Sequence, residues 1–135
     1  MNWRYVDCPQ LQYERFQVTR AGSLVGYLVL RRCEELELRN GILVDALALN
    51  DDDKVWDALI SFADRFFLGG VAGVEAAFSS DGAIDALKRA GYFATKIHRP
   101  TIVCGDRATL SELSQARNWF LNRGDHDWDQ IHLVH

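Results

Sequence analysis

The chain has 135 residues, and its 15 lysines and arginines against 19 aspartates and glutamates give a net charge of −4 at pH 7. This length suits one domain, and a hydrophobic content of 48% excludes a disordered or collagen-like chain. The acidic balance argues against a nucleic-acid partner, because phosphate backbones require a basic surface.

Three strands are predicted in the first part of the chain. Residues 13–20 alternate apolar and polar side chains, residues 21–23 form a turn, and residues 24–32 are nearly all apolar. Residues 34–38 alternate again, and Arg39-Asn40-Gly41 predicts a tight turn. Residues 41–49 then form a third strand that is apolar on both faces except at Asp45, as expected for a central strand.

The hydrophobic period changes to that of helices after residue 49. Residues 50–53 (NDDD) offer N-caps for a helix with a broad apolar stripe, which ends at Gly69-Gly70. Residues 71–78 are strand-like, residues 79–81 (SSD) cap a second helix at about 82–90, and Gly91 ends it. Residues 92–97 and 101–104 are again strand-like, residues 109–120 are helical or irregular, and a polar tail follows.

The predicted order is strand-strand-strand-helix-strand-helix-strand, which implies an α/β (equally α+β) fold. The sheet is mixed and mainly antiparallel, with two main helices, in a single domain over residues 1–135. No apolar run reaches the roughly 20 residues of a membrane-spanning helix. Three widely spaced cysteines and the absence of a secretory signal lead us to expect a cytoplasmic protein.

This order resembles the C-terminal two-thirds of the GNAT superfamily of acyl-CoA N-acyltransferases. Residues 24–30 (LVGYLVL) look like the family strand x-V-G-x-x-x-L, and residues 42–49 (ILVDALAL) stand in the place of the central strand beside the cofactor. Residues 80–92 are similar to the family stretch N-x-x-A-x-x-x-Y-x-x-x-G-F. Residues 3–5 (WRY) and 119–125 (WFLNRGD) resemble a bacterial branch associated with cell-surface polysaccharide genes.

The resemblance implies transfer of an acyl group from acetyl-CoA or another acyl-CoA to an amine. Asp45 or Glu75 would accept the amine proton, and Ser80 would assist the leaving thiolate. The cofactor would lie between the strands at 41–49 and 71–78, bound by the backbone of Ala46, Leu47, Ala48, Leu49 and Ser79. The residues alone also single out Asp45, because a carboxylate in an apolar strand is either functional or held in a structural ion pair.

The chain departs from the family at the loop that binds the cofactor diphosphate. Active members have Q/R-x-x-G-x-G/A there, whereas this chain has residues 50–55 (NDDDKV), without a glycine and with three carboxylates. Side chains hinder close approach of phosphate, and carboxylates occupy the positive end of the helix. The family tyrosine is replaced by Leu87, which cannot donate a proton, and the family asparagine by Ser80.

Twelve residues before residue 13 are too few for the first strand and two helices of the family. We therefore expect a GNAT-like domain that lacks these elements, either a C-terminal half or a short natural product. Apolar side chains of the first helix would then be open to a second copy or to a separate N-terminal half (Trp56, Phe62, Phe66 and Phe67).

Two other functions remain open beside acyl transfer. One is a catalytically inactive GNAT-fold domain for binding or assembly, and the other is a binder of a non-phosphorylated ligand in the same cleft. No metal site is predicted. The histidines and aspartates at 126–135 match no metal-binding spacing, and a solvated tail explains them better.

Overall fold

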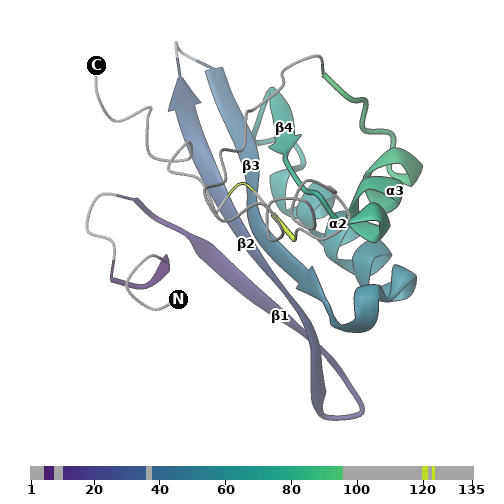
Figure 1. The fold of residues 1–135 in the computed structure, drawn as a ribbon. Helices are drawn as coiled ribbons and strands as arrows, with labels where there is room; N and C mark the ends of the chain where they lie inside the picture. Colours follow the sequence, from purple (N-terminus) through teal and green to yellow (C-terminus); the bar gives the residue numbers. More distant parts are fainter. Residues whose placement is uncertain (1–4, 8–10, 36–37, 96–119, 122, 124–135) are drawn as a thin grey trace, which may run out of the picture.

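The computed structural model describes residues 5–7, 11–35, 38–95, 120–121 and 123. Three long strands come first and two helices follow, with a short strand between the helices (Figure 1). The elements are β1 (Glu14–Arg20), β2 (Ser23–Glu35), β3 (Leu38–Ala48), the 3-10 helix η1 (Leu49–Asp51), α2 (Asp53–Phe67), β4 (Gly73–Ala76) and α3 (Asp81–Arg89).

The four strands form one mixed sheet in the order β1-β2-β3-β4. The β1-β2 and β2-β3 pairs are antiparallel, and the β3-β4 pair is parallel. The predicted turn after β1 is confirmed, since Ala21 and Gly22, with φ of 50° and 83°, join Arg20 to Ser23. The predicted α+β fold, a mainly antiparallel mixed sheet with two helices, is confirmed for the described residues.

Both helices cover one face of the sheet, which we call the helix face (Figure 1). Side chains at alternate strand positions, such as Leu28, Leu30 and Leu43, pack there against α2 and α3. Trp56 of α2 is fully buried in this cluster, and its ring contacts Phe78 at a centroid distance of 5.9 Å. This cluster is the main hydrophobic core of the described chain.

The opposite side of the sheet, which we call the far face, carries a second buried cluster. It consists of Tyr5, Tyr13, Val29, Cys33, Ile42 and Val44. Tyr5 and Tyr13 pack edge to face, with ring centroids 5.2 Å apart. Since residues 28–30 of β2 and 42–44 of β3 are buried on both faces, apolar side chains follow one another there instead of alternating with polar ones.

A β-bulge in β3 places two successive side chains on the far face. Val29 pairs with Asp45, but the next residue, Leu30, pairs with Leu43, so Val44 is an extra residue. Val44 belongs to the far-face cluster, and Asp45 accepts a hydrogen bond from Tyr5 of the same cluster. Regular alternation after Val44 would place Asp45 on the helix face, whereas the bulge places its carboxylate on the far face.

The predicted turn at Arg39-Asn40-Gly41 is wrong. These residues lie inside β3, where Asn40 pairs with Cys33 and Gly41 pairs with Arg32. Gly41 is needed for packing: a Cβ there would lie 2.8 Å from ring atoms of Phe67. The Asn-Gly pair indicated a hairpin, but Gly41 instead leaves room for the ring of Phe67.

The two predicted helices are confirmed, with capping residues as expected. Asp52 caps α2, and Ser80 caps α3 by accepting from the Ala83 backbone N–H at 3.3 Å. Gly91, with φ of 92°, follows α3 as predicted. The strand between the helices, β4, is shorter than the predicted range 71–78.

The predicted strand at 92–97 is not formed at residues 92–95, which are in neither helix nor strand. Residues 96–97 and the predicted elements at 101–104 and 109–119 lie outside the described residues. In the apolar stripe of α2, Trp56 and Phe67 are buried, and the half-buried Phe62 and Phe66 pack on Phe16 of β1. A partner on the accessible part of this stripe stays a prediction.

Candidate functional site

The loop between β3 and α2 carries the acidic triplet Asp51, Asp52 and Asp53. Asn50 and Asp51 both have left-handed backbone, with φ of 55° and 53°. This conformation favours glycine, although asparagine and aspartate tolerate it better than other residues. The loop thus has a backbone that suits glycine, but each position carries a side chain.

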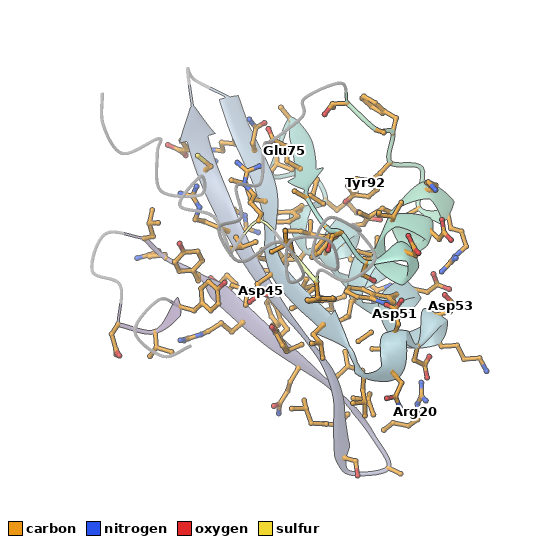
Figure 2. The ribbon with its side chains drawn as sticks, in the orientation of Figure 1. Arg20, Asp45, Asp51, Asp53, Glu75 and Tyr92 are labelled. Atoms are coloured by element: carbon orange, nitrogen blue, oxygen red, sulfur yellow. The ribbon has the colours of Figure 1, made fainter. Side chains whose placement is uncertain are left out.

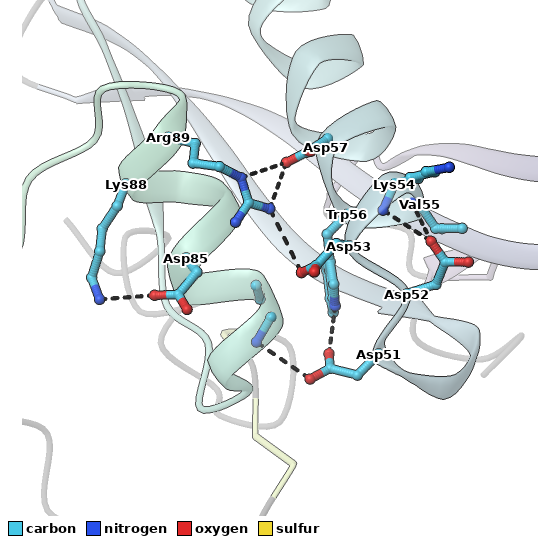
Figure 3. Close-up of polar contacts among 12 residues, drawn as sticks. Asp51, Asp52, Asp53, Lys54, Val55, Trp56, Asp57, Asp85, Lys88 and Arg89 are labelled. Carbon is cyan, nitrogen blue, oxygen red and sulfur yellow. Dashed lines mark hydrogen bonds and ion pairs between the residues drawn. The ribbon is translucent and has the colours of Figure 1, made fainter.

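Asp52 occupies the N-terminus of α2. Its Oδ1 accepts from the backbone N–H groups of Lys54 at 2.9 Å and Val55 at 3.2 Å (Figure 3). Its Oδ2 accepts from Arg20 Nη1 at 2.9 Å. The hydrogen bond from Arg20, then that from Val55, lowers the pKa of Asp52 below its ordinary value. The first free N–H groups of the helix are therefore bonded to the chain's own carboxylate.

Asp51 plays a similar part at the N-terminus of α3. Its Oδ1 accepts from Trp56 Nε1 at 2.5 Å and Ser80 Oγ at 2.7 Å, and its Oδ2 accepts from the Gly82 N–H at 3.3 Å. Partial desolvation raises its pKa, but the hydrogen bonds from Ser80, Trp56 and Gly82 outweigh it and hold the pKa below the ordinary value. The carboxylate fills the space in front of Gly82, where a Cβ would lie 2.6 Å from Oδ1.

Ion pairs join the two helices beside this loop. Arg89 Nη2 lies 2.7 Å from Asp57 Oδ1 and 3.7 Å from Asp53 Oδ1 (Figure 3). The hydrogen bond to Asp57 raises the pKa of Arg89. Figure 2 shows Asp51 and Asp53 together at this end of α2, far from Glu75. All three carboxylates of the triplet thus have partners within the chain.

The sheet opens between β3 and β4, as the resemblance implies. The two strands pair only from Asn40–Gly73 to Leu43–Ala76, whereas β3 continues to Ala48. Pairing ends next to the bulge at Val44. The second half of β3 therefore has no partner strand in β4.

The residues predicted to bind a cofactor lie on both sides of this opening. Ala46 and Ala48 are buried in the main core, Leu47 is half-buried and Leu49 is exposed. The Ser79 N–H donates to the Leu121 carbonyl at 2.8 Å, and Ser79 Oγ accepts from the Leu121 N–H at 2.6 Å. The backbone N–H of Ser79 is thus already bonded within the chain.

Asp45 is buried on the far face and held by two tyrosines. Its residue surface is 6% exposed, and its carboxylate accepts from the hydroxyl groups of Tyr5 and Tyr27, each at 3.1 Å. The two tyrosines come from different parts of the chain: Tyr5 lies in the segment before β1, and Tyr27 lies in β2. A carboxylate held in this way has a fixed position on the sheet.

Glu75 lies on the same face but on β4. Its neighbours Val74 and Ala76 pack against the main core, so the alternation of β4 directs Glu75 to the far face. It pairs across the sheet with Ile42, and its Oε2 accepts from Arg123 Nη1 at 2.7 Å. Figure 2 shows Asp45 and Glu75 at different heights along the sheet.

Ser80 belongs to a different hydrogen-bond network from Asp45 and Glu75. It caps α3, and its hydroxyl donates to Asp51. The structure thus brings Asp45 and Glu75 to one face and places Ser80 with the acidic triplet. Leu87, at the position of the family tyrosine, is half-buried against the core.

Tyr92 follows α3 and packs against the main core. Its hydroxyl donates to Asp64 Oδ1 of α2 at 2.7 Å. Burial, and then the hydrogen bond to Asp64, raises the pKa of Tyr92. The hydroxyl is therefore engaged between the helices.

Two buried arginines on the far face were missed by sequence reasoning. Arg31 is 4% exposed and Arg123 is 3% exposed. The only available pattern was strand alternation, which places Arg31 on the same side as Val29 and Cys33. No pattern in the polar stretch around Arg123 indicated burial.

Among the described residues, no group of three or more histidine, cysteine, aspartate or glutamate side chains is arranged to hold a metal ion. The histidines of residues 126–135 lie outside the described range. No helix in the described part of the chain is long and apolar enough to cross a membrane.

No protein-family model and no curated protein matches the sequence, whereas several solved structures match the fold. TTHA1254 from Thermus thermophilus superposes with a TM-score of 0.58 at 14% identity, over 69% of this chain and 72% of that chain. An aminoglycoside acetyltransferase, meta-AAC0020, from an uncultured soil metagenomic sample superposes with a TM-score of 0.54 at 17% identity. The match covers 70% of this chain and 66% of that chain.

A third similar structure is a ribosomal-protein-alanine N-acetyltransferase from Brucella melitensis biovar Abortus 2308. It superposes with a TM-score of 0.51 at 18% identity, over 68% of this chain and 71% of that chain. At these identities the likeness concerns the fold. The described sheet and its two helices therefore have the fold of GNAT-type acetyltransferases.

Proposed function

We propose that this chain is a GNAT-fold binding domain that does not hold acyl-CoA by its diphosphate. The observation that carries the proposal is the carboxylate of Asp52 on the N–H groups of Lys54 and Val55. A diphosphate at the N-terminus of α2 would need these same donors. It would also meet three carboxylates well within the Debye length of about 8 Å.

The two arginines beside this loop already form ion pairs with aspartates of the chain. Arg20 of β1 is paired with Asp52. Arg89 is paired with Asp57 and Asp53. The residues present therefore do not fit the diphosphate of coenzyme A, and the ligand of this domain would be of another chemical class.

The second candidate is acyl transfer to an amine. Two observations favour it: the opening between β3 and β4 beyond Leu43, and the buried carboxylate of Asp45 beside that opening. In this function Asp45 would accept the proton of the attacking amine. The GNAT-type fold is compatible with both candidates, because one fold hosts many functions.

Calorimetric titration with acetyl-CoA distinguishes the two candidates. We expect no heat from the wild-type chain up to millimolar ligand. Micromolar binding by the wild type would overturn the proposal and support the acyltransferase. In that case Asp45→Asn should abolish transfer to an amine without changing the affinity for acetyl-CoA.

A variant without the three carboxylates tests whether their negative charge prevents the binding of acyl-CoA. Asp51→Asn, Asp52→Ser and Asp53→Asn together remove three negative charges, and serine retains a capping oxygen for α2. If the carboxylates block the site, this variant should bind acetyl-CoA more tightly than the wild type. Glu14→Gln, on exposed β1, is the control for loss of a charge elsewhere.

Assembly with a second copy or with a separate N-terminal half remains part of the proposal. The described chain exposes Leu68 and Phe93, which are 84% and 85% accessible. Light scattering that shows a strict monomer at high concentration would contradict the homodimer. A cytoplasmic location and the likeness to a polysaccharide-associated bacterial branch remain predictions.

A further inference from the structure

The outer edge of β1 has no partner strand in the described part of the chain. The sheet order is β1-β2-β3-β4, and Figure 1 shows β1 as the outermost strand. The opposite side of the sheet differs, because beyond β4 Ser79 exchanges two hydrogen bonds with Leu121. An open edge presents backbone N–H and C=O groups to which a further strand can bond.

The side chains of β1 alternate between the two faces of the sheet without interruption. Phe16 and Val18 pack against the main core, so they lie on the helix face. Glu14 and Arg20, at the next alternate positions, lie on the same face and are exposed. The bulge in this hairpin falls in β2, where Val25 is the extra residue, so the alternation of β1 continues over its whole length.

The sequence of β1 complements itself in an antiparallel pairing centred on Gln17. Glu14 would then lie opposite Arg20 of the second copy, and Arg20 opposite Glu14, so that opposite charges meet twice on the helix face. Phe16 would meet Val18 twice between these pairs. The neighbouring registers, centred on Phe16 or Val18, would instead place Glu14 opposite Val18 or Arg20 opposite Phe16. The charges of β1 therefore favour one register.

Arg20 can make this contact and keep its contact with α2. It donates to Asp52 through Nη1, and its guanidinium has other N–H groups for Glu14. The side chain of Arg20 is 55% exposed. The ion pair across the two copies therefore does not require the N-cap of α2 to change.

A partly exposed aromatic cluster lies beside the same edge. The ring of Phe16 lies 4.5 Å from that of Phe62 and 5.4 Å from that of Phe66, measured between centroids. All three side chains are half-buried. The pairing centred on Gln17 places the α2 helices of both copies on one side of a continuous sheet, so the accessible parts of the two clusters lie next to each other.

We infer that a second copy of this chain adds its β1 strand antiparallel to this edge, so that the two sheets become one. Backbone hydrogen bonds hold the two strands together, and the Glu14–Arg20 pairs set the register. Charged residues ordinarily protect an edge strand from pairing, but in this register the charges of β1 attract. The inference rests on the assembly named in the proposed function, since it specifies the partner and the surface.

Cysteine cross-linking of the full chain tests the register. In Gln17→Cys the two new thiols lie directly opposite each other, at a spacing that a disulfide can bridge. Thr19→Cys is the matched control, because Thr19 is exposed on the same face of β1. Its two thiols would lie about 13 Å apart along the strands, which is beyond the reach of a disulfide.

Under mild oxidation, Gln17→Cys should give at least about tenfold more disulfide-linked dimer than Thr19→Cys. The wild-type chain, with its three cysteines, measures the background. Equal cross-linking of the two variants, or none above the background by Gln17→Cys, would overturn the inference.

A charge exchange tests the pairs between Glu14 and Arg20. Glu14→Arg alone and Arg20→Glu alone each place like charges opposite one another, so each variant should be monomeric by light scattering where the wild type is dimeric. An equimolar mixture of the two restores opposite charges between unlike chains and should dimerise. Glu34→Arg is the control for a reversed charge, because Glu34 lies on β2 and pairs with Arg39 of its own chain.

A wild type that stays monomeric up to about millimolar concentration would overturn the inference and leave the edge to a strand from a different chain. A mixture of the two variants, each folded by circular dichroism, that stays monomeric would also overturn it. Micromolar binding of acetyl-CoA would instead overturn the proposed function and leave the dimer unaffected, because the pairing of β1 uses none of the N–H groups at the start of α2.

Discussion

Charged groups on the two sides of the sheet differ in how far the chain itself supplies their hydrogen-bond partners. At the start of the two helices that cover the helix face, the carboxylates of Asp51 and Asp52 each accept several hydrogen bonds, with donors from α2, α3 and β1. On the far face, the guanidinium of Arg31 is buried with two donors unpartnered. Both regions are polar, but only the two carboxylates of the first region have their hydrogen-bond partners within the described chain.

This difference separates charged groups that stabilise the fold from one that does not. A carboxylate whose bonds are made by the chain stabilises the fold and has little capacity for a ligand. A buried cation without acceptors does not stabilise the fold by itself. Substitutions on the two faces should therefore change stability in different directions.

Asp51→Ala should have the largest effect. It removes the acceptor of Trp56 Nε1, a group on a fully buried side chain, and leaves Ser80 and Gly82 without this partner. We expect the free energy of unfolding to fall by about 2 kcal/mol, measured by urea denaturation. Asp51→Asn retains one acceptor oxygen and should lose less, and equal losses would show that the hydrogen bonds are unimportant.

Gly82→Ala tests the same contact from the other side. The new Cβ would lie 2.6 Å from Asp51 Oδ1 and 2.8 Å from its Cγ, so the carboxylate must move away from α3. We expect a loss of about 1 kcal/mol, although alanine ordinarily stabilises a helix relative to glycine. Gly73→Ala is the control for adding a methyl group, because no atom lies within 4 Å of a Cβ at that position.

Arg31→Met should leave stability unchanged or raise it by about 1 kcal/mol in the absence of ligand. Replacing a buried uncompensated charge by an apolar side chain of similar length removes a desolvation cost. The midpoint of thermal unfolding measures the change. A clear loss of stability would show that Arg31 is structural and that the two faces do not differ in the way described.

The fold was largely predictable because its signals are local. The strand alternation of residues 13–20, the caps Asp52 and Ser80, and the stop at Gly91 each depend on neighbours in sequence. The turn at Asn40-Gly41 failed because the role of Gly41 depends on Phe67, which lies on another element. A glycine in a sequence does not reveal whether it serves a turn or a close contact.

The candidate site was predictable only in part. Asp45 was identified because a carboxylate in an apolar strand is conspicuous, and the acidic triplet because it replaces a glycine loop. The bulge that turns Asp45 to the far face, its two tyrosine partners and the burial of Arg31 and Arg123 depend on contacts between distant segments. No spacing in the sequence encodes such contacts.

The smallest expected effect is the pH dependence of the helix-face network. The folded state lowers the pKa of Asp51 and Asp52 below their ordinary value of 3.8, so the unfolded chain binds protons first as the pH falls. The stability that these groups contribute is complete above pH 3.8 and is lost as the pH falls through their folded pKa values. The urea midpoint of Asp51→Asn with Asp52→Ser should therefore differ from that of the wild type at pH 7, and the difference should shrink in acid. A difference that stayed constant with pH would mean that the two carboxylates act through packing alone, and the charge contrast between the two faces would lose its basis.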